Sequence, residues 1–273
     1  MCRPTYYTIA YEINPWMNVQ RQANHSRAVR QWEALYALLT RRLNVSVQLL
    51  RPVRGLPDLV FTANAGLVWE HTLIRSNFRY PQRQGEEAVI ERHFRQRGFQ
   101  VERLPRTFNF EGEGDALWVG EALLLGFRFR SDAQAHEHLS RLLRCRVLPL
   151  ELVDRRFYHL DTCFCPLSGT AALWYPKAFD RYGRTVIERC VHDLVEVPRA
   201  DAMRFACNAI VAHHAVIMQA GVSTRLHRQL ARRGFRVKEV DLSEFLKAGG
   251  SAKCLVLRLN SPRARAGRSS QRG

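Results

Sequence analysis

One cysteine and one histidine lie in segments that could support nucleophilic catalysis. Cys254 follows a short glycine-rich turn and precedes the apolar run Leu255–Leu257, so its thiol is expected at the mouth of a strand. In another segment His159, Asp161 and Cys163 alternate along the chain and would share one face of a strand. Because a thiolate can attack a carbon centre while a histidine transfers protons, such a pair is sufficient for covalent catalysis.

Carboxylates gather in a third segment that is rich in glycine. Glu111, Glu113 and Asp115 alternate with glycines, so in a strand the three acidic side chains would share a face. The glycines would allow backbone or substrate to approach closely. Grouped carboxylates require a cation, and a planar guanidinium group matches paired carboxylates. The residues therefore predict an acidic pocket for a guanidinium ligand.

Each of these residues also has a purely structural explanation. A single cysteine is usually a buried apolar side chain, a strand histidine is usually structural, and acidic residues near glycines often cap loops. The seven cysteines are an odd set, and without a leader peptide they favour free thiols in a reducing cytoplasm. Cys163 and Cys165 are spaced C-x-C with no second pair nearby, so neither a metal nor another cofactor is expected.

A rough internal repeat brings these segments into register. Five segments share a plan in which polar and small residues precede an apolar strand, at spacings of roughly 45–50 residues. They begin at Pro57, Phe110, Phe157, Phe205 and Ala248. Most are followed by a second apolar run typical of a hairpin partner, at Glu121–Phe127, Ala171–Tyr175 and Ala215–Met218.

Helix-like stretches separate the repeats. Ser26–Arg42 has apolar residues at helical spacing, and Glu86–Arg97 and Val222–Arg233 each run into a Gly-Phe pair typical of a helix end. Each unit is thus expected to be strand–strand–helix–strand. Several such units suggest a closed ring of blades, with a strand around Tyr6–Tyr11 completing the last one. In such a ring the polar strand edges meet in one central cavity.

These motifs resemble those of the guanidine-modifying, or pentein, superfamily, and most closely the arginine dihydrolase module of bacterial arginine-guanidine-removing enzymes. The resemblance covers the chain up to about Leu259 and rests on Ile13–Met17, Pro57–Gly66, Arg83–Glu86, Phe110–Leu117, Phe157–Cys165 and Gly249–Leu259. It implies an α/β fold, a five-bladed propeller with pseudo-fivefold repeats, formed by residues 1–260. The basic segment 261–273 is expected to be a disordered tail.

The resemblance also implies roles for individual residues. Cys254 matches the nucleophile, His159 the general acid/base and Glu111 the carboxylate that orients the histidine. Residues that match substrate-binding positions are Asn14, Asn64, Arg83, Asp115, Arg130, Asp161, Gly250 and Ser251. Among them, Asp115 and Asp161 match positions near the guanidinium, while Asn14, Arg83 and Arg130 match positions at the amino-acid end of arginine.

Asn64 is the residue expected to decide the product. Deiminases and dimethylarginine hydrolases resemble one another in having an acidic residue here, whereas dihydrolases have asparagine. An amide holds a cation less strongly than a carboxylate, but it provides an N–H donor for a ureido oxygen. The resemblance therefore implies hydrolysis of L-arginine to L-ornithine, CO2 and two ammonia through a cysteine adduct. A deiminase and a dimethylarginine or succinylarginine hydrolase remain alternatives.

Net charge raises an alternative from another class, a basic nucleic-acid-binding protein that retains the fold. The charge is +17, from 42 Lys and Arg against 25 Asp and Glu, and 38 of the basic residues are arginines. They are spread along the chain without a nucleic-acid-binding signature, so no nucleic-acid partner is expected. No apolar run of about 18 residues predicts a membrane span. Oligomeric state is left open, a homo-oligomer included.

Overall fold

Four short sheets contain the twelve strands of the residues that the computed structural model describes, 1–260. In all four sheets an antiparallel hairpin is joined by a third strand that is parallel to the hairpin's second strand. The strands are β1 (Gly66–Trp69), β2 (Thr72–Arg75), β3 (Gln100–Arg103), β4 (Ala116–Val119), β5 (Ala122–Phe127), β6 (Arg146–Glu151), β7 (Phe164–Pro166), β8 (Ala171–Trp174), β9 (Asp193–Glu196), β10 (Ile210–Ala212), β11 (Ala215–Gln219) and β12 (Arg236–Val240). The predicted tail, 261–273, lies outside the described residues.

A helix links the second and third strands of every sheet, as the repeat predicts. The helices are α1 (His25–Ala37), α2 (Pro81–Arg95), α3 (Ala135–Leu143), α4 (Arg181–Cys190), α5 (Arg199–Ala202), α6 (Thr224–Ala231) and α7 (Ser243–Leu246). The predicted glycine ends are confirmed, because Gly98 and Gly234 have φ of 82° and 79° after α2 and α6. The stretch predicted at 26–42 is α1 followed by a π-helical turn, Leu38–Arg42.

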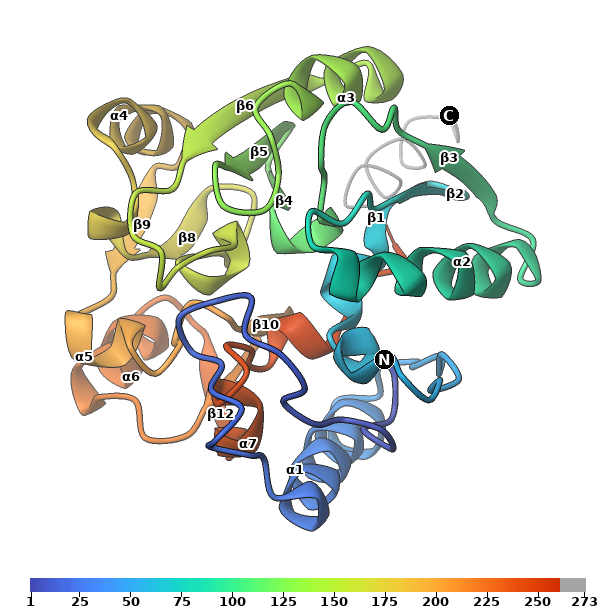
Figure 1. Cartoon of the computed structure of the whole chain (residues 1–273). Helices are drawn as coiled ribbons and strands as arrows, with labels where there is room; N and C mark the ends of the chain where they lie inside the picture. Colours follow the sequence, from blue (N-terminus) through green and yellow to red (C-terminus); the bar gives the residue numbers. More distant parts are fainter. Residues whose placement is uncertain (261–273) are drawn as a thin grey trace, which may run out of the picture.

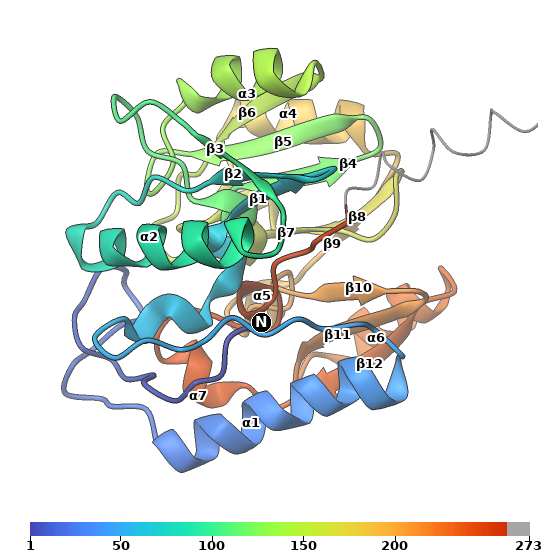
Figure 2. The ribbon, with the colours of Figure 1, turned by 90° about the vertical axis from the view of Figure 1, so that its right-hand side faces the viewer.

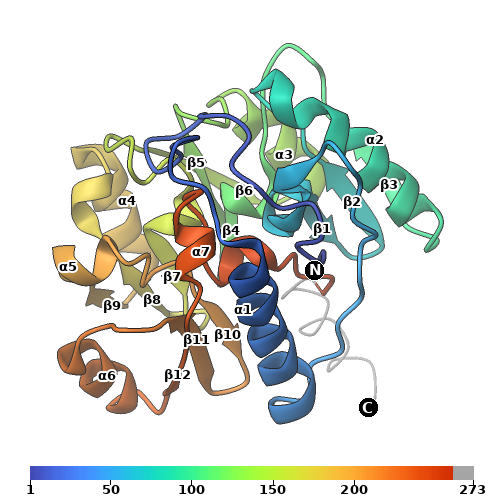
Figure 3. The same ribbon diagram turned by 60° about the horizontal axis from the view of Figure 1, so that its bottom comes forward.

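The sheets follow one another around the centre of the molecule in chain order (Figure 1). The N-terminal and C-terminal parts of the described chain meet, because α1 packs against α7 and β12 (Figures 2 and 3). One hydrophobic cluster spans this junction and includes Tyr7, Trp32, Phe245 and Leu255. The hydrogen bond from Thr62 Oγ1 to the Leu255 carbonyl, across 193 positions, then brings the Cys254 segment beside the first repeat.

The segments that carry the chemistry are not strands, and this part of the prediction was wrong. They form single 3-10 turns just before or near the strand starts, at Thr62–Ala65, Gly112–Gly114, Leu160–Thr162 and Lys253–Leu255. In a 3-10 turn side chains are spaced around an axis and do not alternate between two faces. Each turn can therefore direct neighbouring residues to different sides of the layer.

The predicted closing strand at Tyr6–Tyr11 is also absent: this segment has no regular pairing. The N-terminal segment instead forms a β-bridge before Tyr6, a parallel bridge between Cys2 and Leu50 in which Leu50 N–H donates to the Met1 carbonyl at 2.9 Å. Four of the five expected units are thus sheets among residues 1–260, and the fifth blade stays a prediction. Within the same residues no helix is long and apolar enough to cross a membrane.

Candidate active site

The thiol of Cys254 lies inside the molecule, with 2% of the residue exposed. Its Sγ lies 3.5 Å from Asp161 Oδ2, as donor, and accepts a hydrogen bond from Asn208 Nδ2 at 3.1 Å. Burial, and then the Asp161 carboxylate, raise the pKa of the thiol well above its ordinary value, while Asn208 and Lys253 oppose this rise. The neutral thiol is therefore favoured until a cation enters beside the sulfur.

His159 is oriented by a buried carboxylate. Its Nε2 lies 2.8 Å from Glu111 Oε2, and the Arg130 Nη1 donates to the same oxygen at 3.0 Å. Burial alone would raise the pKa of Glu111, but Arg130 and the hydrogen bond from His159 hold it well below its usual range. An ionised carboxylate only accepts, so the histidine proton is assigned to Nε2. Nδ1 is buried without a partner among residues 1–260 and is left to exchange protons.

The two aspartates predicted near the guanidinium differ in whether a carboxylate oxygen is left without a hydrogen bond. Both oxygens of Asp115 are occupied, by Ser131 Oγ at 2.6 Å and by Leu160 N–H at 3.1 Å. Asp161 contacts the thiol through Oδ2, while its Oδ1 is buried with no partner in the described chain. Burial raises the pKa of Asp161 to about 7, against the opposing effect of Lys253. Asp161 is therefore the aspartate that can accept from a ligand.

The side-chain amide of Asn64 has a defined orientation. Arg83 Nη1 donates to Asn64 Oδ1 at 2.8 Å, and Glu86 holds the rest of that guanidinium through hydrogen bonds of 2.8 Å. The amide oxygen must face arginine, so Nδ2 faces away from it. Nδ2 is buried without a partner within residues 1–260. A Cβ added at Gly114 would lie 2.3 Å from this nitrogen, so the glycine permits its approach.

Arg130 and Asn14, predicted at the amino-acid end of the substrate, lie close to the same centre. The Arg130 guanidinium lies 4.8 Å from the Tyr80 ring centroid and 4.6 Å from that of Tyr158. Its Nη2 donates to the Ile13 carbonyl at 3.0 Å. Asn14 Nδ2 donates to the carbonyl of Ala248 at 3.0 Å, which joins the N-terminal loop to the turn before Cys254.

The turn that precedes the nucleophile is packed too closely for larger residues. A Cβ at Gly250 would lie 2.3 Å from the Phe61 ring, and Gly249 has a φ of 80°. Ser251 N–H donates to Asn208 Oδ1 at 3.1 Å, while Ser251 Oγ is a buried hydroxyl with no partner in the described part of the chain. The turn is therefore held in place and has one free hydroxyl.

Two residues that the strand pattern grouped with the site point elsewhere. Cys163 lies in the hydrophobic core, where burial raises its pKa well above the ordinary value. Glu113 turns away from Glu111 and accepts from Lys253 Nζ at 2.8 Å and from Arg258 N–H at 3.0 Å. The cause is the 3-10 turn Gly112–Gly114, which sends successive side chains to different sides.

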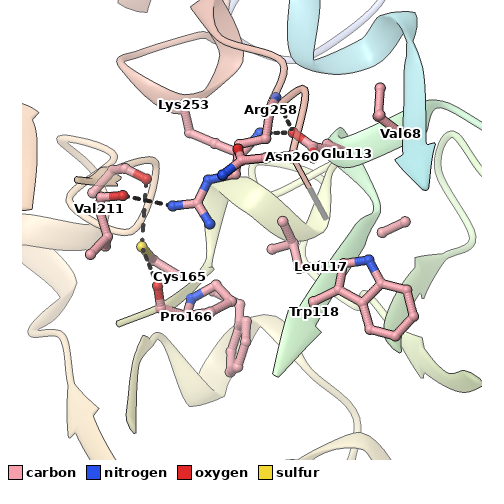
Figure 4. Close-up of a pocket in the computed structure, with 13 residues that line it drawn as sticks. Val68, Glu113, Leu117, Trp118, Cys165, Pro166, Val211, Lys253, Arg258 and Asn260 are labelled. Carbon is pink, nitrogen blue, oxygen red and sulfur yellow. Dashed lines mark hydrogen bonds and ion pairs between the residues drawn. The ribbon is translucent and has the colours of Figure 1, made fainter. Parts of the chain in front are cut away.

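The ion pair between Lys253 and Glu113 lines a small cavity (Figure 4). Its volume is about 40 Å3, and Cys165, Trp118 and Arg258 are among its lining residues. Cys254 and His159 are not among the residues that line it. Lys253, the neighbour of the nucleophile in the chain, is therefore held by Glu113 at this cavity.

Sequence reasoning missed three buried side chains of the site. Asn208 contacts Cys254 directly, Tyr158 Oη donates to the Gly249 carbonyl at 2.7 Å, and Asp58 has an oxygen without a partner among residues 1–260. A signal for Asn208 exists in the repeat, because it stands two residues before β10 as Asn64 stands two before β1. No group of three or more His, Cys, Asp or Glu in residues 1–260 could hold a metal ion.

Comparison with known proteins decides the family. Residues 9–260 match the family described as N,N dimethylarginine dimethylhydrolase, eukaryotic. The chain belongs to this family. The N(G),N(G)-dimethylarginine dimethylaminohydrolase of Mycobacterium tuberculosis is 38% identical over 260 residues, which cover 95% of this chain and 85% of that protein.

A second group of similar proteins is named for a different activity. The bifunctional arginine dihydrolase/ornithine cyclodeaminase ArgZ of Synechocystis is 46% identical over 96% of this chain, but the match covers only 37% of that relative. The crystal structure of the ArgZ N-terminal domain bound to substrate, an arginine dihydrolase from cyanobacteria, superposes with a TM-score of 0.92 at 45% identity. That comparison covers 96% of this chain and 97% of the domain, so the α/β fold is shared along the whole described chain.

Proposed function

We propose that this chain is an arginine dihydrolase that hydrolyses L-arginine to L-ornithine, CO2 and two ammonia through a covalent adduct on Cys254. The observation that carries the proposal is Nδ2 of Asn64, which has no partner within residues 1–260 and faces away from Arg83, since Arg83 binds the amide oxygen. A neutral donor at this point can bind the oxygen of a ureido intermediate, which an acidic residue would repel. The similarity to the ArgZ domain supports the same reading.

In this proposal the guanidinium group enters between Asp161 and Asn64. Asp161 Oδ1, buried and without a partner in the described chain, accepts from one guanidinium nitrogen. The cation beside the sulfur lowers the pKa of the Cys254 thiol, which burial had raised, so that substrate binding itself produces the thiolate. Arg130 supplies positive charge for the substrate carboxylate, Arg83 acts by holding Asn64, and Asp58 offers the α-amino group an oxygen that has no partner in the described chain.

Bond making then follows from these positions. The thiolate of Cys254 adds to the guanidinium carbon, the proton that the thiol has lost passes to Nδ1 of His159, and Nδ1 then transfers it to the departing ammonia. Water, deprotonated by the same nitrogen, attacks the thiouronium carbon, and the tetrahedral species expels ornithine, whose nitrogen takes that proton. A second water hydrolyses the remaining carbamoyl thioester, which releases the thiolate, CO2 and the second ammonia. Glu111 holds the imidazole in one orientation throughout.

A second function, hydrolysis of dimethylarginine, is favoured by the family match and by the mycobacterial relative. Product analysis separates the two. Purified protein is incubated with L-arginine, dimethylarginine and succinylarginine, and ammonia, methylamines, citrulline and ornithine are quantified, with Cys254→Ala as the blank. Two ammonia and one ornithine per arginine support the proposal. One ammonia with citrulline indicates a deiminase, and dimethylamine as the main product indicates the second function.

The five-bladed propeller belongs to the same proposal. The parallel bridge between Cys2 and Leu50 encloses α1, as the second and third strands of each sheet enclose a helix. Leu257 packs in one hydrophobic cluster with both residues, where the first strand of a fifth blade would lie. A crystal structure with ladder pairing between residues 255–259 and the N-terminal segment would establish the fifth blade.

A further inference from the structure

Asn208 is buried, lies between α5 and β10, and is absent from the expected site. Its side-chain amide makes four hydrogen bonds, all to Asp161, Ser251 or Cys254. Nδ2 donates to Cys254 Sγ at 3.1 Å and to the Asp161 carbonyl at 3.2 Å. Oδ1 accepts from the backbone N–H groups of Ser251 and Cys254, both at 3.1 Å. The two donors and two acceptor positions of the amide are thus all used.

This pattern leaves one orientation for the amide. A flipped side chain would place the NH2 group against two backbone N–H donors and leave both without an acceptor. The Nδ2–H must therefore point at the sulfur. The same side chain also holds the backbone of the nucleophile at both Ser251 and Cys254, so the position of Sγ and the direction of the donor are set together.

The other polar side chains near the sulfur act against ionisation or act from further away, while the Ser251 backbone N–H, like Asn208, lowers the pKa of the thiol. Asp161 is the nearest carboxylate, at 3.5 Å from Sγ, and a negative charge there disfavours a thiolate. Lys253 faces the other way, since its Nζ bonds to Glu113 and to the Val256 carbonyl. Tyr158 Oη donates to the Gly249 carbonyl, not to the sulfur. Asn208 is thus the side chain of residues 1–260 that donates to Sγ.

We propose that Asn208 is a catalytic residue that stabilises the Cys254 thiolate by donating Nδ2–H to Sγ, while its Oδ1 aligns the nucleophile turn. A donor is worth more to the charged sulfur than to the neutral thiol, so it favours the reactive form. When the sulfur becomes bonded to the substrate carbon, the donor has no anion to stabilise, and it acts again when the thiolate leaves. The inference rests on the nucleophilic role of Cys254 in the proposed function.

Alkylation of Cys254 tests the proposal without any turnover. The protein is treated with iodoacetamide from pH 6 to 11, and trypsin, which cuts after Lys253 and Arg258, releases the Cys254 peptide for mass spectrometry. For Asn208→Ala and Asn208→Asp, the pH midpoint of alkylation should rise by about one to two units, because each removes a hydrogen bond to a charged group. The control Asn18→Asp, an exposed Asn-to-Asp change, should leave the midpoint at the wild-type value.

Two results would overturn the proposal. If Asn208 only held the turn, Asn208→Ala would expose the thiol and its midpoint would stay or fall, since burial is what raises it. If the pH midpoint of alkylation rose in Asn208→Asp but not in Asn208→Ala, the rise would come from the added carboxylate charge and the proposed hydrogen bond would be refuted. In steady-state assays kcat should fall ~10- to 100-fold with KM changed less than about threefold. A wild-type protein without arginine turnover but with the expected midpoints would refute the proposed function and leave this inference standing.

Discussion

Replacing Gly114 by alanine should disable the site without adding or removing any charged group. The new Cβ would lie 2.3 Å from Asn64 Nδ2 and 3.3 Å from the His159 ring. Real Cβ contacts are essentially never under 3.0 Å, so the amide or the backbone must move by about 0.7 Å. Arg83 holds the opposite end of the amide at 2.8 Å, so Asn64 cannot move without weakening that hydrogen bond.

The magnitude follows from the size of this displacement. A reacting group misplaced by about 1 Å can cost ~100-fold in rate, so kcat for arginine should fall ~10- to 100-fold. Overpacking costs about 1–3 kcal/mol, which for a chain of this size lowers the melting temperature by roughly 2–12 °C. Displacement of the Asn64 donor should also raise the share of citrulline among the products.

The assay combines kcat, product ratio and thermal melting, with Gly169→Ala as the matched control. A Cβ at Gly169 meets its nearest atom, Gly120 Cα, at 3.6 Å, which is an ordinary contact. This control should keep wild-type kcat and product ratio. If Gly114→Ala shows wild-type kcat, products and melting temperature, the close packing of Gly114, Asn64 and His159 does not matter for catalysis and the reasoning fails.

Three further changes probe the same site. Cys254→Ala should abolish turnover while leaving the fold intact, and residual arginine hydrolysis would contradict its assignment as nucleophile. Asn64→Ser shortens the donor and should shift products from ornithine toward citrulline; an unchanged ratio measured by amino-acid analysis would show that Asn64 does not select the product. Burial raises the pKa of Asp161 to about 7, so the native carboxyl binds a proton that the unfolded chain releases near pH 4, and stability falls as pH rises between those values. At pH 8 the free energy of unfolding of Asp161→Asn should therefore exceed that of wild type, by on the order of 4 kcal/mol at most, and its melting temperature should be higher. The difference in melting temperature should disappear near pH 4; a pH-independent difference would contradict this.

Several of the arginines that contribute to the net charge pair with acidic side chains at the surface. Exposed arginines pair with exposed acidic side chains, as Arg128 does with Glu151 at 2.8 Å and Arg141 with Glu137 at 3.7 Å. Such pairs contribute little to stability. The electrostatics that matter for chemistry lie inside, where Glu111 and Asp161 are buried beside Arg130 and Lys253. The buried carboxylates of the site thus lie inside an arginine-rich protein.

Local patterns predicted the repeating unit and the helices well. Alternation and helical spacing depend on near neighbours in the chain, so the hairpins of three repeats and α1, α2 and α6 were recognisable. The glycines after α2 and α6 marked helix ends because few other residues adopt positive φ there. The same rules failed at the catalytic segments, where tertiary packing around the centre imposes 3-10 turns on residues that alternate like strands.

Motif resemblance brought Cys254, His159, Glu111 and Asn64 to attention, and the fold places them in one buried layer. What the residue types alone could not decide is which of their atoms remain free. Asp115 and Asp161 have the same side chain, yet one is saturated by Ser131 and Leu160 and the other keeps an open oxygen.

The sequence by itself determined the repeat, three of its hairpins and three of the helices, because these depend on residue type and short spacing, and its resemblance to a known family predicted the reactive groups. Only the tertiary structure decided the tautomer of His159, the orientation of Asn64 and the role of Asn208. Each of these depends on a partner between 19 and 48 residues away, at Glu111, Arg83 and Cys254. Hydrogen bonds across such separations form only when the sheets assemble around the centre and bring the segments together, so no local pattern encodes them.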